Sequence, residues 1–176
     1  RYICLSGKGI CCNCNGEQDL SIPEFFDRIA PHDPHPAERS WKPQIAVINA
    51  GTNDVGGPTP KEEFSEAAYG FIQRIRARYE DVKIIWMYGM MNDMYVDSLK
   101  NAVRRANQEE QSVYFLYVKS ISSQMGEIGA AGHPNVKANV RAATLLTKKI
   151  RSITDWKAKH IAAEEETESA ESLAAN

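Results

Sequence analysis

The fold of this chain is decided by residues 44–57, which read QIAVINAGTNDVGG. Residues 45–48 are apolar and rich in β-branched side chains, as is typical of a strand buried on both faces of a parallel sheet. Residues 51–54 are small or polar, and such residues turn the chain and hydrogen-bond the local backbone. Because ligands of open α/β sheets bind outside the carboxyl ends of the strands, the sequence predicts that Asn53 meets a substrate. The simpler alternative is that Asn53 and Asp54 only form the turn.

Outward from this stretch, strand and helix patterns alternate along the chain. Short apolar runs predict strands over residues 1–5, 44–50, 82–88 and 113–118. Helical spacing of apolar residues predicts helices over residues 22–29, 60–79, 94–108 and 134–153, with Ser21 and Thr59 as the N-caps of the first two. The order β-α-β-α-β-α-β-α predicts a doubly wound, three-layer α/β/α sandwich with a mostly parallel sheet over residues 1–154.

Length and composition are those of one soluble globular domain. The chain has 176 residues, of which 43% are hydrophobic and 25% are charged. A net charge of −2 offers no basic surface, so we expect no nucleic-acid partner. The apolar runs are too short to span a membrane. Residues 155–176 are acidic and rich in alanine, which indicates a solvated helix or a disordered tail.

All four cysteines lie within the first fourteen residues: Cys4, Cys11, Cys12 and Cys14. The C-x-x-C spacing of Cys11 and Cys14 is typical of zinc sites and of redox-active thiol pairs. A structural zinc site needs about four ligands, and only His32 and His35 could complete such a set here. The alternative, which we favour, is free or disulfide-bonded loop cysteines, and a disulfide would indicate an oxidising compartment.

Three short motifs occur in an order that resembles the SGNH (GDSL-like) hydrolases. SGKG at residues 6–9 resembles the second conserved block, NAGTND at 49–54 the third, and GHPN at 132–135 the fifth. More narrowly, the chain resembles the catalytic domain of carbohydrate esterase family 2. That likeness rests on YICLSGKGICCN at 2–13, IPEFFDR at 22–28, VINAGTND at 47–54 and FIQRIRARY at 71–79. The resemblance implies a flavodoxin-like fold and a cofactor-independent esterase that deacetylates plant polysaccharides such as xylan or mannan.

The resemblance also implies roles for three residues. His133 matches the catalytic base, which takes a proton from a serine and returns it to the leaving sugar hydroxyl. Asn53 matches the side-chain donor of the oxyanion hole, and Gly7 matches its backbone N–H donor, although Gly9 is a second choice for that donor. Each such donor contributes roughly 3–4 kcal/mol to transition-state stabilisation. The alternatives are that Gly7 only turns the chain and that His133 only precedes a helix.

The sequence departs from the family pattern at two points. The aspartate that usually stands three residues before the histidine is replaced by Ala130, so a Ser-His dyad steadied by a backbone carbonyl is expected; Glu127 is not expected to substitute. The GDS block, which carries the nucleophilic serine, is absent, and Ser6 belongs to the second block instead. Any serine nucleophile is therefore expected to lie outside this chain.

The missing GDS block also carries the first strand of the family's sheet, which lies between the strands predicted at residues 1–5 and 44–50. Without it, buried backbone groups are left unpaired, at a cost of about 1–3 kcal/mol each. We therefore expect a companion chain or a missing N-terminal segment to supply this strand. The alternative is a catalytically inactive carbohydrate-binding or structural subunit that has kept the fold and lost the nucleophile.

Trp41, Tyr88 and Met90 are candidates for the walls of a sugar site, because aromatic faces suit pyranose rings. For Tyr88 and its neighbour Trp86, a place in the core is the favoured alternative, since both lie on a predicted strand. By resemblance alone, the protein is expected to be secreted or extracellular.

Overall fold

The computed structural model describes residues 2–38, 40–57 and 59–156. Three parallel strands form one sheet in the order β1-β2-β3: β1 (Ile45–Ile48), β2 (Lys83–Tyr88) and β3 (Val113–Tyr117). The α-helices are α1 (Ile22–Phe25), α2 (Lys61–Arg78), α3 (Val96–Glu109) and α4 (Val136–Ile153). Two short 3₁₀ helices, η1 (Asn53–Gly56) and η2 (Ala130–Gly132), follow the carboxyl ends of strands.

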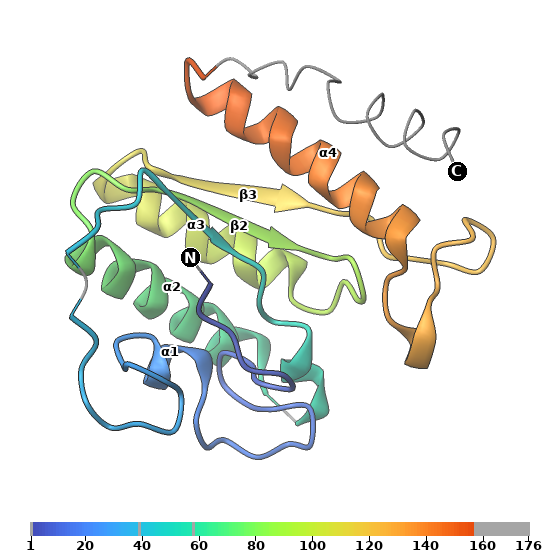
Figure 1. Cartoon of the computed structure of the whole chain (residues 1–176), viewed down its shortest axis with the longest axis horizontal. Helices are drawn as coiled ribbons and strands as arrows, with labels where there is room; N and C mark the ends of the chain where they lie inside the picture. Colours follow the sequence, from blue (N-terminus) through green and yellow to red (C-terminus); the bar gives the residue numbers. More distant parts are fainter. Residues whose placement is uncertain (1, 39, 58, 157–176) are drawn as a thin grey trace, which may run out of the picture.

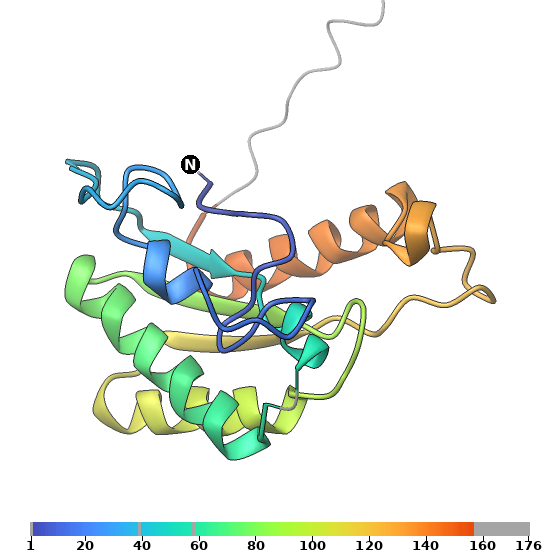
Figure 2. The same cartoon turned by 90° about the horizontal axis from the view of Figure 1, so that it is seen from below.

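The helices cover both faces of the sheet, which gives the three layers that the sequence predicts (Figures 1 and 2). Helices α2 and α3 pack on one face and α4 packs on the other. Side chains alternate along β2, so that Ile84 and Trp86 face α2 and α3 while Ile85 and Met87 face α4. The core is therefore continuous through the middle strand, whose residues 84–88 are all buried.

Most predicted elements are confirmed with small shifts at their ends. Ser21 forms a capping box with Glu24, whose carboxylate accepts the N–H of Ser21 at 2.7 Å. The N-cap of α2 is Pro60 rather than Thr59. Helix α1 ends at Phe25, four residues earlier than predicted. The long helices agree best with prediction because each places an apolar stripe against the sheet.

The strand predicted over residues 1–5 is the main correction to the fold. Residues 2–5 belong to no strand, and the sheet of the described residues has three strands instead of four. A strand needs a neighbour with which to exchange hydrogen bonds, and no ladder reaches residues 2–5. As a result, β1 is an edge strand that pairs with β2 alone.

The predicted tail lies almost wholly outside the described residues, which end at Trp156. Helix α4 ends at Ile153, close to the domain boundary predicted at residue 154. Within the described part of the chain, no helix has both the length and the apolar character needed to cross a membrane.

Candidate active site

The polar turn after β1 lies at the carboxyl end of the sheet. Gly51 has a φ of +115°, and a Cβ there would lie 3.0 Å from the ring of Phe64 and 3.1 Å from that of Tyr88. Only glycine fits this combination of backbone angle and close packing. The chain then enters η1, whose first residue is Asn53. The sequence prediction that Asn53 follows the strand on its carboxyl side is thus confirmed.

The side-chain amide of Asn53 connects the turn to the loop of residues 6–9. Its Nδ2 donates a hydrogen bond to the backbone carbonyl of Lys8 at 2.9 Å. An amide group has two N–H donors, so one remains for a ligand. Among the hydrogen bonds between described residues, none uses the backbone N–H of Gly7 or Gly9. The bond between Asn53 and Lys8 therefore joins the loop of residues 6–9 to the turn after β1, across 45 residues of sequence.

Asp54, next to Asn53, holds the same two segments together from within. Its side chain is fully buried and accepts the backbone N–H groups of Ile10, Cys11 and Cys12 at 2.6–3.1 Å. A Cβ at Gly9 would lie 2.4 Å from Oδ2 of Asp54, so the loop can approach the carboxylate only because residue 9 is glycine. From sequence, Asp54 is only a turn residue, and the three N–H donors that meet it become neighbours only in the folded chain.

All four cysteines are free thiols, and two of them, Cys11 and Cys12, contact Asp54 through their backbone N–H groups. Burial, followed by the charge of Asp54, raises the pKa of Cys11 to about 12. The Sγ of Cys12 donates to the backbone carbonyl of Asp54 at 3.2 Å, whereas Cys4 and Cys14 are exposed. The described residues contain no group of three or more potential metal ligands. The zinc site considered for the C-x-x-C spacing therefore has no ligand set in this part of the chain.

His133 ends a tight loop just before α4. Its backbone N–H donates to the carbonyl of Ala130 at 3.0 Å, and its carbonyl accepts from Gly129 at 2.6 Å. Ala131 and Gly132 have positive φ angles of 51° and 75°, which fold the chain back on itself. Asn135 then caps α4 by accepting the N–H of Ala138 at 3.2 Å. The imidazole is left exposed by this arrangement.

Glu127 and Arg141 fix the base of this loop. The carboxylate of Glu127 is buried and accepts two hydrogen bonds from Arg141, both at 2.7 Å. Hydrogen bonding to Arg141 lowers the pKa of Glu127. Arg141 bonds both carboxylate oxygens, and among the described residues no hydrogen bond joins the side chain of Glu127 to His133. The pair is a support for the loop, and sequence reasoning missed the contribution of Arg141.

The structure brings Asn53 and the loop of residues 6–9 into contact but does not join His133 to them. Helices η1 and η2 lie toward the same end of the sheet, with the loop that follows β2 running out beside them (Figures 1 and 2). Among the described residues, the imidazole of His133 forms no hydrogen bond with Asn53 or with residues 6–9. The candidate base and the candidate oxyanion donors thus lie toward the same end of the sheet without a hydrogen bond between them in the described part of the chain.

The three candidate sugar-contacting residues have different positions. Tyr88 is 1% exposed and donates its hydroxyl hydrogen to Asn92, so it belongs to the core instead of to a sugar-binding surface. Trp86 is also fully buried, with its Nε1 donating to Ala50 at 3.1 Å, which confirms the core alternative. Met90 is half-buried in the loop after β2. Trp41 stacks on Tyr79 with ring centroids 5.4 Å apart, beyond the amino end of β1.

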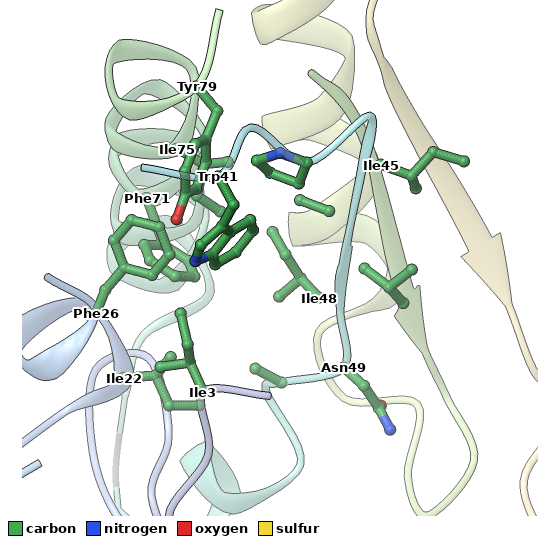
Figure 3. Close-up of a pocket in the computed structure, with 14 residues that line it drawn as sticks. Ile3, Ile22, Phe26, Trp41, Ile45, Ile48, Asn49, Phe71, Ile75 and Tyr79 are labelled. Atoms are coloured by element: carbon green, nitrogen blue, oxygen red, sulfur yellow. The ribbon is translucent and has the colours of Figure 1, made fainter. Parts of the chain in front are cut away.

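A groove of about 240 Å³ runs beside the free edge of β1 (Figure 3). Residues 45–50 form one wall and Ile3 lies opposite them. Phe71 and Ile75 of α2 contribute apolar side chains to the lining, and Trp41 lies above them. The groove lies where the sequence analysis places a missing strand, between residues 1–5 and 44–50.

Comparison with known proteins places the chain in a family. The family model of the GDSL-like Lipase/Acylhydrolase family matches residues 7–139. The chain is similar to the cellulase/esterase CelE of Acetivibrio thermocellus, with 28% identity over 164 residues, which cover 88% of this chain and 20% of that protein. The matched region includes the Gly7–Gly9 loop, Asn53 and His133.

Solved structures with a similar fold are carbohydrate esterases. One is a family two carbohydrate esterase from Clostridium thermocellum in complex with cellohexaose, with a TM-score of 0.79 and 26% identity. Another is the acetyl xylan esterase Est2A from Butyrivibrio proteoclasticus, with a TM-score of 0.76 and 19% identity, which shows the fold alone. The matches cover 86% of this chain but only 49% and 50% of those proteins. The chain thus spans about half the length of these solved relatives.

Proposed function

The chain belongs to the GDSL-like lipase/acylhydrolase family, and on this premise we propose that it forms part of the catalytic domain of a serine esterase that deacetylates carbohydrate. The similarity to carbohydrate esterases supports the substrate class. The proposed substrates are acetylated polysaccharides or sugars, and the proposed nucleophile is a serine on a segment outside these 176 residues.

The observation that carries this proposal is the contact between Asn53 and the carbonyl of Lys8. This bond ties Asn53 to the loop that carries Gly7 and Gly9, whose backbone N–H groups form no hydrogen bond among the described residues, and this supports the proposal that the three residues supply the oxyanion donors. Donors held in fixed positions by the fold stabilise the negative oxygen of a tetrahedral intermediate, because they need no reorganisation when the charge develops. The same donors bind a neutral carbonyl oxygen less strongly, so they favour the transition state over the substrate.

In the proposed reaction, the external serine attacks the acetyl carbonyl carbon while the imidazole of His133 takes the hydroxyl proton. The oxyanion is held by Asn53 and by Gly7 or Gly9. The intermediate collapses, and His133 returns the proton to the departing sugar hydroxyl, which leaves an acetyl-serine. Water, deprotonated by His133, then releases acetate and restores the serine. Because Ala130 replaces the usual aspartate, we propose that a backbone carbonyl steadies the imidazole.

The proposed chemistry uses side chains and backbone groups alone, so it calls on no cofactor. Met90 and the exposed Met91, in the loop after β2, are the proposed contacts for the sugar side of the substrate. Trp41 lies beyond the other end of β1 and is proposed as a sugar contact only if a polysaccharide extends along the groove. A secreted location follows as a proposal, because polymeric substrates of this class lie outside cells.

The proposal is tested by labelling the protein, purified as it occurs in its source, with a fluorophosphonate probe. Intact and peptide mass spectrometry then locate the modified serine, and release of acetate from acetylated xylan is measured in parallel. We expect a labelled serine outside residues 1–176 and acetate release that His133→Ala abolishes, whereas the matched variant His35→Ala retains activity. His35 is an exposed histidine that pairs with Asp33 at 2.7 Å, far from the proposed chemistry in sequence.

Three outcomes would contradict the proposal. Labelling of a serine within residues 1–176 would place the nucleophile in this chain. Acetate release that survives His133→Ala would remove the proposed base. Binding of an oligosaccharide without labelling or acetate release would support the alternative of an inactive binding subunit, which the comparisons do not favour.

A further inference from the structure

The loop of residues 89–93, which follows β2, is attached to the turn that carries Asn53. Within this loop, Nδ2 of Asn92 donates to the backbone carbonyl of Thr52 at 3.3 Å. Oδ1 of Asn92 accepts the hydroxyl hydrogen of Tyr88, whose ring is buried in the core. Because Thr52 forms the peptide bond that precedes Asn53, this contact fixes the entry of the chain into η1. The loop after β2 therefore borders the proposed oxyanion hole.

Asp93, next to Asn92, attaches the same loop to the end of β3 and to the chain beyond it. Its Oδ2 accepts the hydroxyl hydrogen of Tyr117 at 3.1 Å, and its Oδ1 lies 2.9 Å from Oγ of Ser120. Oγ of Ser120 also lies 2.6 Å from the carbonyl oxygen of Gly89, so one hydroxyl proton is shared between two acceptors of the same loop. Desolvation, followed by the hydrogen bond to Asp93, raises the pKa of Tyr117, so its hydroxyl stays protonated and remains a donor.

Two further contacts hold these loops against each other. The backbone N–H of Ile121 donates to the carbonyl of Met90 at 2.9 Å. Gly89 has a φ of +113°, and a Cβ there would lie only 2.6 Å from the ring of Tyr117. Glycine at this position therefore lets the aromatic ring lie directly on the loop, which aims its hydroxyl at Asp93.

Arg141 carries the connection onward to the loop of His133. Its Nη2 donates to the backbone carbonyl of Lys119, in the segment after β3, at 2.9 Å. The same guanidinium holds both carboxylate oxygens of Glu127. The backbone carbonyl of Glu127 in turn accepts the N–H of Asn135, two residues after His133, at 2.9 Å.

These contacts form one continuous path over the carboxyl ends of the three strands. The path begins at Asn53, passes through residues 92–93 and 119–120, and ends at His133. Among the described residues, no hydrogen bond joins Asn53 to His133 directly. Their separation is therefore set by the contacts along the path, and the carboxylate of Asp93 is its middle link.

We propose that Asp93 is a positioning residue of the esterase: by holding the loop after β2 to the segment after β3, it sets the place of His133 relative to Asn53. The roles of His133 and Asn53 rest on the proposed function, whereas the contacts of Asp93 stand without it. A misplacement of about 1 Å, even one caused far from the chemistry, can cost about 10²-fold in rate. Asp93 thus acts on the reaction through the loops that it joins.

The kinetic test compares Asp93→Ala and Asp93→Asn in the whole protein that carries the serine. Alanine removes both acceptors, so we expect kcat for acetate release to fall about 10- to 100-fold while KM stays nearly constant. An asparagine oxygen still accepts from Tyr117, and its amide donates to Ser120, which then donates to Gly89. Asp93→Asn should therefore recover most of kcat. Asp97→Ala, at an exposed aspartate of α3, is the matched control.

Three kinetic results would overturn the proposal. A kcat of Asp93→Ala equal to that of Asp97→Ala would show that Asp93 has no part in the reaction. A rise in KM with unchanged kcat would make Asp93 a substrate contact. Equal losses of kcat in Asp93→Ala and Asp93→Asn would show that the negative charge is needed, as it is for a carboxylate that stabilises the imidazolium directly.

Amide hydrogen exchange follows the connection itself and needs no activity. In Asp93→Ala, we expect Ile121 and Asn135 to exchange about 3- to 10-fold faster, as the loss of one hydrogen bond implies. Val118, whose N–H donates to the carbonyl end of β2, should keep its rate and thereby show that the sheet stays folded. An unchanged rate for Asn135 would overturn the proposal, because the displacement would then not reach the loop of His133.

Failure of this role and failure of the proposed function give different results. A wild-type protein without fluorophosphonate labelling or acetate release would reject the esterase, and the exchange rates of Ile121 and Asn135 would then decide whether Asp93 joins the loops. An active wild type with an equally active Asp93→Ala would keep the esterase and reject the role of Asp93.

Discussion

The carboxylate of Asp54 accepts the backbone N–H of Cys11 at 2.6 Å, although the two residues are 43 positions apart in the sequence. The same carboxylate also accepts the N–H groups of Ile10 and Cys12. Through these bonds, the loop that carries Gly7 and Gly9 is attached to the turn that carries Asn53. The proposed oxyanion hole therefore depends on Asp54, whose side chain is fully buried.

Replacing Asp54 with asparagine should destabilise the protein. The amide presents one acceptor oxygen where the carboxylate presents two, and its NH₂ group faces backbone N–H donors. Buried groups that lose their partners cost about 1–3 kcal/mol each, and we expect a loss of that order in the free energy of unfolding. Urea denaturation measures it. The control is Asp97→Asn on the exposed surface of α3, and equal stability of the two variants would contradict the role given to Asp54.

Replacing Asn53 with alanine should lower kcat far more than it raises KM. Removal of one oxyanion donor typically costs a factor of about 10²–10³ in kcat, because the donor acts mainly on the charge of the transition state. The measurement is acetate release by the protein that carries the serine. Asn15→Ala, in an exposed loop, is the matched control. A rise in KM with unchanged kcat would show that Asn53 binds substrate and transition state equally.

The pair of Glu127 and Arg141 should make stability depend on acidic pH. Hydrogen bonding to Arg141 lowers the pKa of Glu127 below its ordinary value of 4.5. The folded state thus binds this proton less readily than the unfolded state, so the contribution of Glu127 is complete above pH 4.5 and is lost as the pH falls through the lowered pKa.

Thermal unfolding between pH 3 and pH 7 tests this prediction. Glu127→Gln should flatten the acidic part of the profile and lower Tm at pH 7, whereas Glu110→Gln, at an exposed helix end, should leave both unchanged. Identical profiles of Tm against pH for wild type and Glu127→Gln would show that the pair contributes nothing to the stability of the folded state. Because the pair supports the loop of His133, we also expect Glu127→Gln to reduce kcat.

Cys11 should resist alkylation. With its pKa raised to about 12, the thiol stays protonated at pH 8, and only the thiolate reacts readily. Iodoacetamide should first modify the exposed Cys4 and Cys14, as peptide mass spectrometry would reveal. Labelling of Cys11 should increase as the pH rises, or when urea unfolds the protein. Rapid labelling of Cys11 at pH 8 in the folded protein would contradict the raised pKa and the partial burial of this thiol.

Local features of the sequence account for most of the fold. The apolar spacing predicts α2, β2, α3, β3 and α4 to within a few residues. Each helix buries an apolar stripe and each strand is apolar on both faces, so the pattern is visible in the sequence. Ser21 and Glu24 predict the start of α1, since both partners of the capping box lie within one turn. Asn53 was placed correctly at the end of β1 because the change from apolar to polar residues is itself local.

Other features depend on partners that are distant in sequence. The prediction of a strand at residues 1–5 was wrong for residues 2–5, because a segment with strand propensity forms no ladder without a hydrogen-bonding neighbour. Tyr88 was a candidate sugar contact, yet the packing of α2 and α3 buries it. Nothing in the local sequence of Arg141 indicates that it binds both oxygens of Glu127.

The layers, the order of the elements and the motifs that end the strands could therefore be predicted from sequence, since hydrophobic periodicity and turn chemistry act over a few neighbouring residues. Tertiary contacts were needed to learn that Asp54 binds the loop of residues 10–12, that Cys11 is half-buried, and that β1 has a free edge beside an apolar groove. These are properties of segments that meet only when the chain folds, because hydrogen-bond partners and burial are set by distance in space and not by distance along the chain.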